Sequence, residues 1–355
     1  MQWTSSDILW TIITVQAVWL FYLLLFRKVK PLQSFHVARP TTSFATAMDR
    51  AHLLRVRDDA KWRKIEKREA LNPICCTGLL THGKRTECSI VFFHGLTNCP
   101  YQFHKMAQIF HKMGYNVLTP RLPHHGHANP LTERLAHITA EELFDLSGDA
   151  VDAACGLGER VTVVGFSLGG VLASWIAQTR TDVERVIIIS PALATKAIPI
   201  WLNDAASRTL PVLPNRFMWW DSDTQNRPPS QTHAYPRYST RAVGHLLRAS
   251  QIVYQVANTA RPKAKSILMS LNPCDEAVDN RGAIRLAETW KRHGVNVYMH
   301  QFDQSWNLAH DIIDPTSPQQ QVDRVYPILL RLITNATPND NAQPDTAGEV
   351  VAPAF

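Results

Sequence analysis

A serine flanked by glycines stands where an apolar strand pattern passes into a helical one. In the stretch VVGFSLGGVLASW, residues 163–175, Gly165 and Gly169 each lie two positions from Ser167. A sharp strand-to-helix turn holds its central residue in an unfavourable backbone conformation, so the residues two positions away must be small. The pattern predicts a nucleophile elbow that exposes the Ser167 hydroxyl for acyl transfer; the alternative is a tight turn without chemistry.

A serine hydroxyl becomes a good nucleophile only when a histidine takes its proton and a carboxylate orients that histidine. Asp275 directly follows the apolar stretch KSILMSL, and His310 follows the last predicted strand after a short loop. Along the chain, an elbow of this kind is followed first by the acid and then by the histidine. We therefore predict a catalytic triad of Ser167, Asp275 and His310.

Other acidic and histidine residues near these positions are weaker candidates. Asp279 shares the loop of Asp275 and is the second choice for the acid because it lies farther from the strand end. His300 lies inside an alternating strand pattern, where a packed or surface histidine is expected. We expect Asp303 and Asp311 to be loop and helix-start residues.

The negative charge that develops on a carbonyl oxygen in acyl transfer needs backbone N–H donors, each worth on the order of 3 kcal/mol. One donor is expected from Leu168, the residue after the nucleophile. The second is expected after an earlier strand, in VFFHGLTNCP, where Gly95 lets the chain turn and Leu96 presents its N–H. Leu96 and Leu168 are therefore the predicted oxyanion hole.

Strands and helices alternate along most of the chain, which is typical of an α/β fold with a doubly wound, mainly parallel sheet. Strands are expected in the run that ends at His94 and at 115–120, 160–164, 185–190, 265–271 and 295–302, and helices at 101–113, 140–154, 168–179, 241–256, 281–293 and 319–333. The alternation stops at residues 191–262, a Pro-, Trp- and Arg-rich stretch that we interpret as a cap inserted over the sheet. The core then comprises residues 71–190 and 263–335, and residues 336–355 are expected to be a disordered tail.

Together these motifs resemble the α/β-hydrolase fold over residues 71–335. The form His94-Gly95-Leu96-Thr97 is similar to bacterial carboxylesterases and monoacylglycerol-lipase-like enzymes of the serine aminopeptidase type. The resemblance implies a carboxylic ester hydrolase that needs no cofactor. The stretch PRLPHHGHAN also resembles a loop of that group in which Arg-Gly-His-Gly or Leu-Pro-Gly-His-Gly is usual, and His125 is expected at the glycine position.

The same triad leaves other functions open. An acyltransferase or an aminopeptidase would use the residues named above, and a non-catalytic, membrane-tethered binding protein on a hydrolase scaffold is a further alternative. Four aromatic side chains of the insertion are expected either to line an acyl pocket or to pack the cap against the sheet: Trp201, Phe217, Trp219 and Trp220.

Residues 8–26 contain nineteen residues without a formal charge. As a helix they would extend about 28 Å, nearly the thickness of a hydrocarbon core. We predict a single transmembrane anchor within residues 1–30; a cleaved signal peptide is the alternative. Arg27, Lys28 and Lys30 follow the span, so the positive-inside rule places the hydrolase domain in the cytoplasm.

Residues 31–70 are predicted to be a basic juxtamembrane segment. Its part 50–68 holds eight basic and three acidic side chains, within a chain of net charge +7. Such a stretch is either a solvated helix face or a surface for anionic lipid head groups. Since an anchor and this segment would hold the site near a bilayer, we expect an amphiphilic ester such as a monoacylglycerol or a lysophospholipid as substrate, and no nucleic-acid partner.

The cysteine and histidine spacings predict no metal site. The six cysteines are neither spaced as metal ligands nor dense enough for a small disulfide scaffold, so buried free thiols are expected, as in a cytoplasmic protein. His124, His125 and His127 are clustered but have no acidic or cysteine partner nearby in the sequence.

Overall fold

The computed structural model describes residues 37–65, 70–221 and 233–334, together with 10–12, 14–16 and 19. The expected tail at 336–355 lies outside the described residues, as does the expected membrane span at 8–26 except for those few positions. In the part of the chain that is described, no helix combines the length and the apolar character that a membrane crossing requires.

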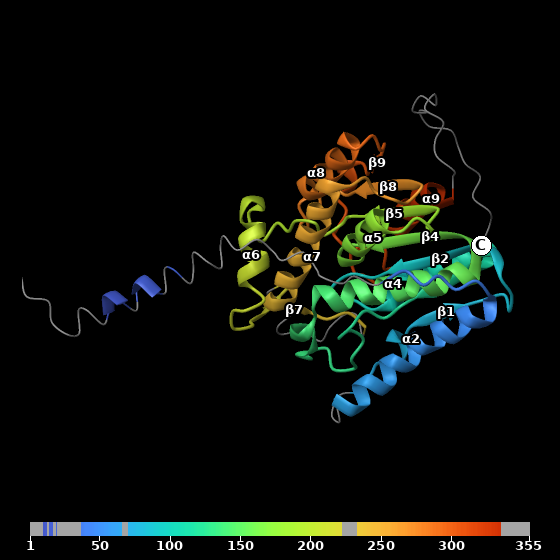
Figure 1. Ribbon diagram of the computed structural model, residues 1–355, viewed down its shortest axis with the longest axis horizontal. Coiled ribbons are helices and arrows are strands. Elements are labelled where there is room, and N and C mark those ends of the chain that lie inside the picture. The colour runs from blue at the N-terminus through green and yellow to red at the C-terminus, as the bar shows by residue number, and fades with distance from the viewer. Residues whose placement is uncertain are drawn as a thin grey trace, which may run out of the picture.

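A seven-stranded sheet forms the centre of the protein (Figure 1). Its strands are β1 (Gly78–Leu80), β2 (Thr86–Phe93), β3 (Asn116–Thr119), β4 (Gly158–Phe166), β5 (Arg185–Ile189), β8 (Ser266–Leu271) and β9 (Tyr298–Gln301). They lie in the order β1-β3-β2-β4-β5-β8-β9, and all neighbouring pairs are parallel except β1 with β3. The predicted doubly wound, mainly parallel sheet of an α/β fold is confirmed.

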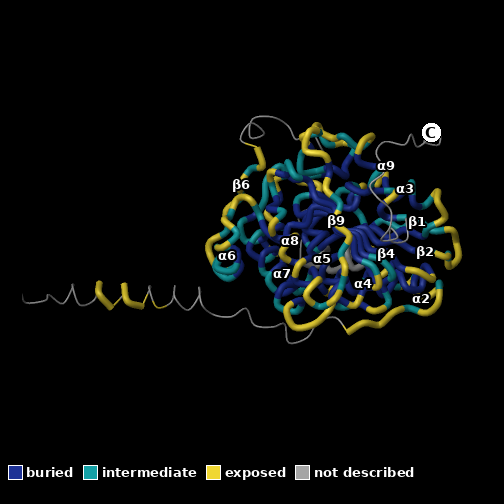
Figure 2. The backbone as a smooth tube through the Cα atoms, turned by 90° about the horizontal axis from the view of Figure 1, so that it is seen from above, coloured by how far each residue is buried: buried dark blue, intermediate teal, exposed yellow. Residues whose placement is uncertain are grey.

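Two layers of helices enclose this sheet. One layer contains α2 (Phe44–Ile65), α4 (Ala140–Leu157), α5 (Leu168–Thr179), α7 (Thr240–Thr259) and α8 (Asn280–Arg292), and the other contains α3 (His104–Lys112) and α9 (Val322–Thr334). Successive side chains of β2 alternate between the layers: Val91 and Phe93 pack in the first, and Ile90 and Phe92 in the second. Because both faces are covered, the central strands are continuous apolar runs, and Figure 2 shows them as the buried interior.

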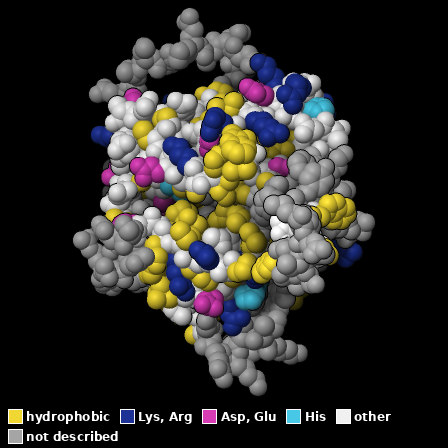
Figure 3. Space-filling view, turned by 90° about the vertical axis from the view of Figure 1, so that its left-hand side faces the viewer, with side chains coloured by type: hydrophobic (Ala, Val, Ile, Leu, Met, Phe, Trp, Pro, Cys, Tyr) yellow, Lys and Arg dark blue, Asp and Glu magenta, His cyan; other side chains and the backbone are white. Residues whose placement is uncertain are grey.

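The chain between β5 and β8, which the sequence predicts to be an inserted cap and which we call the insertion, lies at one end of the sheet (Figure 1). It contains α6 (Asn203–Thr209), the antiparallel pair β6 (Phe217–Trp219) and β7 (Arg237–Ser239), and the long helix α7. Leu247 and Val253 of α7 are fully buried in the main core, so this helix ties the insertion to the sheet. Figure 3 looks onto this end of the molecule and shows hydrophobic side chains gathered around its middle.

Helix α2 packs along α4 and brings part of the basic segment 50–68 onto the folded body. Ala51 of α2 is buried, and Arg50 Nη1 lies 2.8 Å from Asp152 Oδ2 in α4. The same buried carboxylate accepts a second ion pair from Arg180 Nη1 at 2.7 Å. Two cations therefore balance the buried charge of Asp152, and one of them joins α2 to the core.

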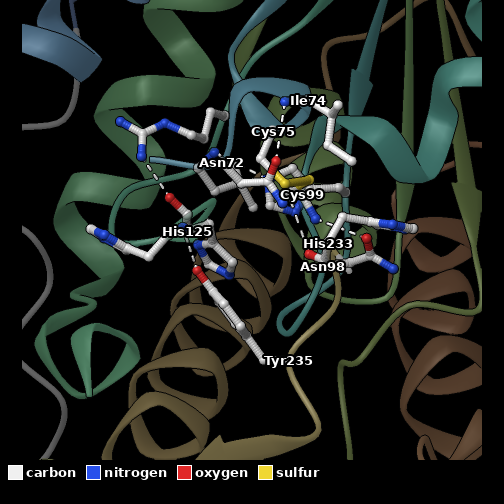
Figure 4. Close-up of a disulfide and its surroundings, with 12 residues drawn as sticks. Asn72, Ile74, Cys75, Asn98, Cys99, His125, His233 and Tyr235 are labelled. Atoms are coloured by element: carbon white, nitrogen blue, oxygen red, sulfur yellow. Dashed lines mark hydrogen bonds between the residues drawn. A yellow bond between two sulfur atoms is a disulfide. The ribbon is translucent and has the colours of Figure 1, made fainter. Parts of the chain in front are cut away.

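A disulfide joins Cys75 to Cys99, whose Cα atoms lie 5.3 Å apart (Figure 4). The prediction that all cysteines are free thiols is wrong for this pair, because the short 3-10 helices Pro73–Cys75 and Pro100–Phe103 lie against each other and bring the two residues together. The other four cysteines, all described, are not in disulfides. The expectation of free thiols was one argument for a cytoplasmic location. Because disulfides persist in oxidising compartments, this bond takes that argument away.

Candidate active site

Ser167 stands between the end of β4 and the start of α5, with φ 56° and ψ −113°. A positive φ is uncommon for a residue with a side chain. The chain approaches itself so closely here that a Cβ on Gly165 would lie 1.9 Å from the Gly169 carbonyl oxygen, and a Cβ on Gly169 would lie 1.9 Å from the Phe93 carbonyl oxygen. Only glycine fits these two positions, and this close approach holds Ser167 in its strained conformation.

The structure brings the three predicted triad residues into one hydrogen-bonded row. His310 Nε2 lies 3.0 Å from Ser167 Oγ, and His310 Nδ1 lies 2.7 Å from Asp275 Oδ2. Asp275 is fully buried, and its Oδ1 accepts the backbone N–H groups of Ala277 and Val278, each at 2.9 Å. Because a carboxylate only accepts hydrogen bonds, Nδ1 carries the proton of the neutral ring and Nε2 is left to accept one from Ser167.

The charges at this row favour an ionised acid and a basic histidine. Burial raises the pKa of Asp275, but His310 and the two backbone donors outweigh it, so the pKa lies below its usual value. Burial lowers the pKa of His310, but the Asp275 carboxylate and then Asp311 raise it, and the net result is a pKa above the usual 6.5. A raised pKa makes His310 a stronger proton acceptor.

The alternative acidic residues and the second histidine lie away from this row. Asp279 caps the start of α8 and pairs with the guanidinium of Arg281. His300 is a residue of β9, as the alternating pattern predicts, and Asp303 caps the 3-10 helix Gln304–Trp306. Of these candidates, only Asp275 contacts His310.

The loop after β2 lies beside the elbow because Gly169 donates its N–H to the His94 carbonyl oxygen at 3.1 Å. This bond joins the two chain segments from which the oxyanion donors are expected. In the described part of the chain, neither the Leu96 N–H nor the Leu168 N–H has a hydrogen-bond acceptor. Neither N–H is thus used by another group in the described part of the chain.

The loop after β3 reaches the same region. His124, with φ 65°, adopts the left-handed conformation that favours glycine, so the prediction that His125 occupies the glycine position is wrong by one residue. His125 Nε2 instead contacts the Leu96 carbonyl oxygen, and its Nδ1 lies 2.8 Å from the Pro123 carbonyl oxygen. Burial lowers the pKa of His125 to about 4, so at pH 7 the neutral ring has one N–H for these two acceptors. Among the described residues, no group of three or more potential ligands is arranged to hold a metal.

The insertion contacts the loop after β2 through Trp220 and through Tyr235, to which the sequence assigned no role. The Tyr235 N–H donates to the Thr97 carbonyl oxygen at 2.7 Å, and Trp220 Nε1 donates to Thr97 Oγ1 at 2.9 Å. His233, which Figure 4 shows near the disulfide, places Nε2 2.6 Å from Asp314 Oδ2. Trp220 was predicted only as a pocket or packing residue, and no motif marks Tyr235, His233 or Asp314.

Comparison with known proteins relates this chain to hydrolases. Residues 90–328 match the model of a family described as the alpha/beta hydrolase family. The chain is also similar to a thermostable monoacylglycerol lipase of Bacillus sp. (strain H-257), with 26% identity over 160 residues. That alignment covers 45% of this chain and 60% of the lipase, less than two thirds of its length.

Solved structures with the same fold include three lipolytic enzymes. One structure is reported with LipS and LipT, two metagenome-derived lipolytic enzymes; its TM-score is 0.55 at 20% identity, over 74% of this chain and 99% of the other. The monoacylglycerol lipase of Paleococcus ferrophilus has a TM-score of 0.54 at 19% identity, over 72% and 97%. A soluble variant of monoglyceride lipase from Saccharomyces cerevisiae has a TM-score of 0.53 at 11% identity, over 73% and 90%. At such low identity these similarities concern the fold.

Proposed function

The chain belongs to the alpha/beta hydrolase family, and from that premise we propose that it is a serine hydrolase that cleaves carboxylic esters with lipid-like acyl groups. The observation that carries this proposal is the hydrogen-bonded row from Ser167 through His310 to Asp275. The same arrangement performs acyl transfer on several unrelated folds. The similarity to a monoacylglycerol lipase supports an ester as the substrate.

In the proposed reaction, His310 Nε2 accepts the proton of the Ser167 hydroxyl as Oγ attacks the carbonyl carbon of the ester. Asp275 keeps Nδ1 protonated and stabilises the imidazolium that forms. The N–H groups of Leu96 and Leu168 bind the oxyanion of the tetrahedral intermediate, each contributing about 3 kcal/mol to the stability of the transition state.

When this intermediate collapses, the alcohol leaves with the proton from His310 and the acyl group remains on Ser167 Oγ. A water molecule then attacks the acyl carbonyl carbon while His310 accepts a proton from it. Release of the carboxylic acid returns the proton to Ser167. Each step uses only the side chains and amides named above and water.

An exposed apolar surface on the insertion supports an amphiphilic substrate (Figure 3). Five large hydrophobic side chains of one short segment are exposed: Trp201, Val212, Leu213, Met218 and Trp220. Single exposed hydrophobic residues are ordinary, but several from one segment indicate a surface that meets apolar material. Trp201 is 77% exposed, so it lines no closed pocket, whereas Trp220 reaches the loop of Leu96.

The first test compares Ser167→Ala with wild type, using a fluorophosphonate probe and p-nitrophenyl esters of increasing chain length. We expect labelling of the wild type alone and a loss in kcat of about 10⁵- to 10⁶-fold in the variant. Ser174→Ala is the matched control, because Ser174 lies in α5 but bonds only to the Gly170 carbonyl oxygen. Near-normal activity of the Ser167→Ala variant would exclude Ser167 as the nucleophile. A folded wild type that is neither labelled nor active would favour a binding protein, and transfer of the acyl group to an added alcohol would favour an acyltransferase.

We also propose that residues 8–26 attach the enzyme to a membrane, since these nineteen residues carry no formal charge. Extraction of membranes with alkaline carbonate tests this: the full chain should remain in the pellet, and its release would contradict an anchor. The basic residues after the span favour a cytoplasmic domain, whereas the Cys75–Cys99 disulfide favours an oxidising compartment. Protease accessibility in sealed vesicles distinguishes the two orientations.

A further inference from the structure

A glutamine side chain, that of Gln102, fixes the start of the loop that carries Leu96. The Gly95 N–H donates to Gln102 Oε1 at 2.9 Å, so this amide is not available to an oxyanion. Gln102 is 1% exposed and lies seven residues after Gly95 in the chain. Its carbonyl oxygen therefore fixes the His94–Gly95 peptide, which directly precedes the peptide that carries the N–H of Leu96, the predicted oxyanion donor.

The other end of the Gln102 side chain reaches the loop that carries the catalytic base. Gln102 Nε2 donates to Asp311 Oδ2 at 2.9 Å, and Asn98 Nδ2 donates to the same oxygen at 3.2 Å. An N–H group can only donate and a carboxylate can only accept, so Gln102 has one amide orientation that satisfies both partners. Figure 4 shows Asn98 beside the disulfide, at the far end of the same loop.

Asp311 directly follows His310 in the chain and is fixed by its own loop. Its Oδ1 accepts the N–H groups of Ile313 at 3.2 Å and Asp314 at 3.1 Å. Burial and the nearby Asp314 carboxylate raise the pKa of Asp311 above its usual value, and the hydrogen bond from Gln102 offsets part of that rise. The carboxylate thus has four donors: two from its own loop, Asn98 from the loop of Leu96, and Gln102 from the 3-10 helix that follows it.

We propose that Gln102 and Asp311 are positioning residues that hold the oxyanion-hole loop in register with the loop of His310. This inference rests on the proposed function and adds to it, because neither side chain touches the reacting atoms. The elbow fixes the Leu168 amide through its own backbone, but the Leu96 amide lies in a loop outside any strand or helix. The bridge connects residues 209 positions apart, so a shift of either loop moves the oxyanion donor relative to the base.

The test exchanges donor and acceptor across the bridge. Gln102→Glu places two carboxylates together, and Asp311→Asn turns an amide N–H toward the N–H groups of Gln102 and Asn98. Each single variant should lower kcat about 10²-fold with little change in KM, since a misplacement of about 1 Å can have that effect. The double variant restores a matched pair, because the introduced asparagine amide can donate to the introduced carboxylate, which can also accept the Gly95 N–H. It should therefore regain most of the lost kcat.

Gln178→Glu is the matched control. Gln178 is also 1% exposed and also bridges two partners, accepting from Trp290 Nε1 at 2.7 Å and donating to the Ala260 carbonyl oxygen at 2.8 Å. It should lower the melting temperature without a selective loss of kcat.

Asp311→Asn should also move the acid limb of the pH profile to lower pH, because the Asp311 charge raises the pKa of His310.

Wild-type kcat in both single variants would contradict the proposed bridge. So would a folded double variant whose fold-loss in kcat equals the product of the two single losses. If Gln102→Glu does not fold, Gln102→Asn replaces it, because the shorter side chain reaches only one partner; unchanged kcat would then refute the proposal. Hydrogen exchange of the peptide 94–99 gives an answer that does not depend on turnover. Exchange at Gly95 should quicken in each single variant and slow again in the double variant, so failure of the proposed function and failure of the bridge are distinguishable.

Discussion

Two segments supply the amides proposed for the oxyanion hole, and they are built in different ways. The elbow at Ser167 is held by its own backbone, because β4 and α5 meet at glycines that leave no room for a Cβ. The loop 94–99 is held by side chains and a disulfide from other parts of the chain, in addition to the backbone hydrogen bonds from Gly169 and Tyr235. The proposed oxyanion hole would therefore depend on one local motif and on several distant contacts.

The difference determines how each segment tolerates substitution. At the elbow, backbone meets backbone, so no rotamer change relieves an added atom. At the loop 94–99, the contacts come from residues 7 to 213 positions away along the chain, and each can be removed singly. We therefore expect a substitution at an elbow glycine to abolish both folding and activity, and a substitution at the loop 94–99 to reduce activity only in part.

The largest expected effect is at the elbow glycine. Gly169→Ala places a Cβ against the Phe93 carbonyl oxygen and should destabilise the fold by more than about 3 kcal/mol, with loss of activity. Gly95→Ala is the counterpart in the loop, where the nearest atom to a Cβ would be 3.5 Å away in the Phe166 ring, an ordinary contact. Thermal melting should separate the two variants clearly. A stable, active Gly169→Ala variant would show that the elbow tolerates substitution as well as the loop 94–99 does.

A smaller effect is expected from His125, which touches the carbonyl oxygen of the proposed oxyanion donor. His125→Ala should lower kcat about 10²-fold because the Leu96 peptide loses its partner and shifts. His300→Ala, a partly buried histidine in β9, serves as the control and should keep wild-type kcat. A His125→Ala enzyme within about twofold of wild type would show that the loop holds without it.

The disulfide should matter more for stability than for rate. It closes a loop with a sequence separation of 24 residues, so Cys75→Ser should lower the free energy of unfolding by about 3 kcal/mol and kcat by several-fold. A reducing agent should have the same effect on the wild type and none on Cys75→Ser. Cys88→Ser, at a free thiol, is the control, and equal melting temperatures for the two serine variants would argue against the bond.

The smallest effect concerns pH. His310 accepts a proton only when neutral, and its pKa is raised, so kcat/KM should be full above that pKa and fall as the pH drops through a midpoint above 6.5. His125→Ala and Cys75→Ser should keep this midpoint, because neither residue contacts His310. A shifted midpoint in either variant would mean that the loop also acts on the base.

Sequence was sufficient where chemistry is encoded locally. The elbow could be read from five residues, and the sheet from apolar runs that are buried on both faces. Asp275 and His310 could be placed because each follows a strand end, and parallel strands bring such ends to one edge. The histidine at the glycine position of the loop after β3 was misplaced by one residue, since two adjacent histidines give no sign of which one adopts the left-handed conformation.

Other features depend on tertiary packing and have no such signature. Cys75 and Cys99 meet only because two short 3-10 helices lie together, and six cysteines allow many pairings. Asp311 reads as an ordinary loop residue until folding brings Gln102 to it. A single sequence shows the residues that form such a bridge, but it does not show that they lie close together in the folded chain.

The docking of α2 on α4 has a mechanical consequence. Because Ala51 is buried and Arg50 pairs with Asp152, the first turns of this helix cannot swing independently of the folded body. A support attached at Val37 would therefore restrict the tilt of the whole folded body. The height of Ser167 above such a support would be set by the dimensions of the fold, and only esters presented at that height would benefit from the raised effective concentration.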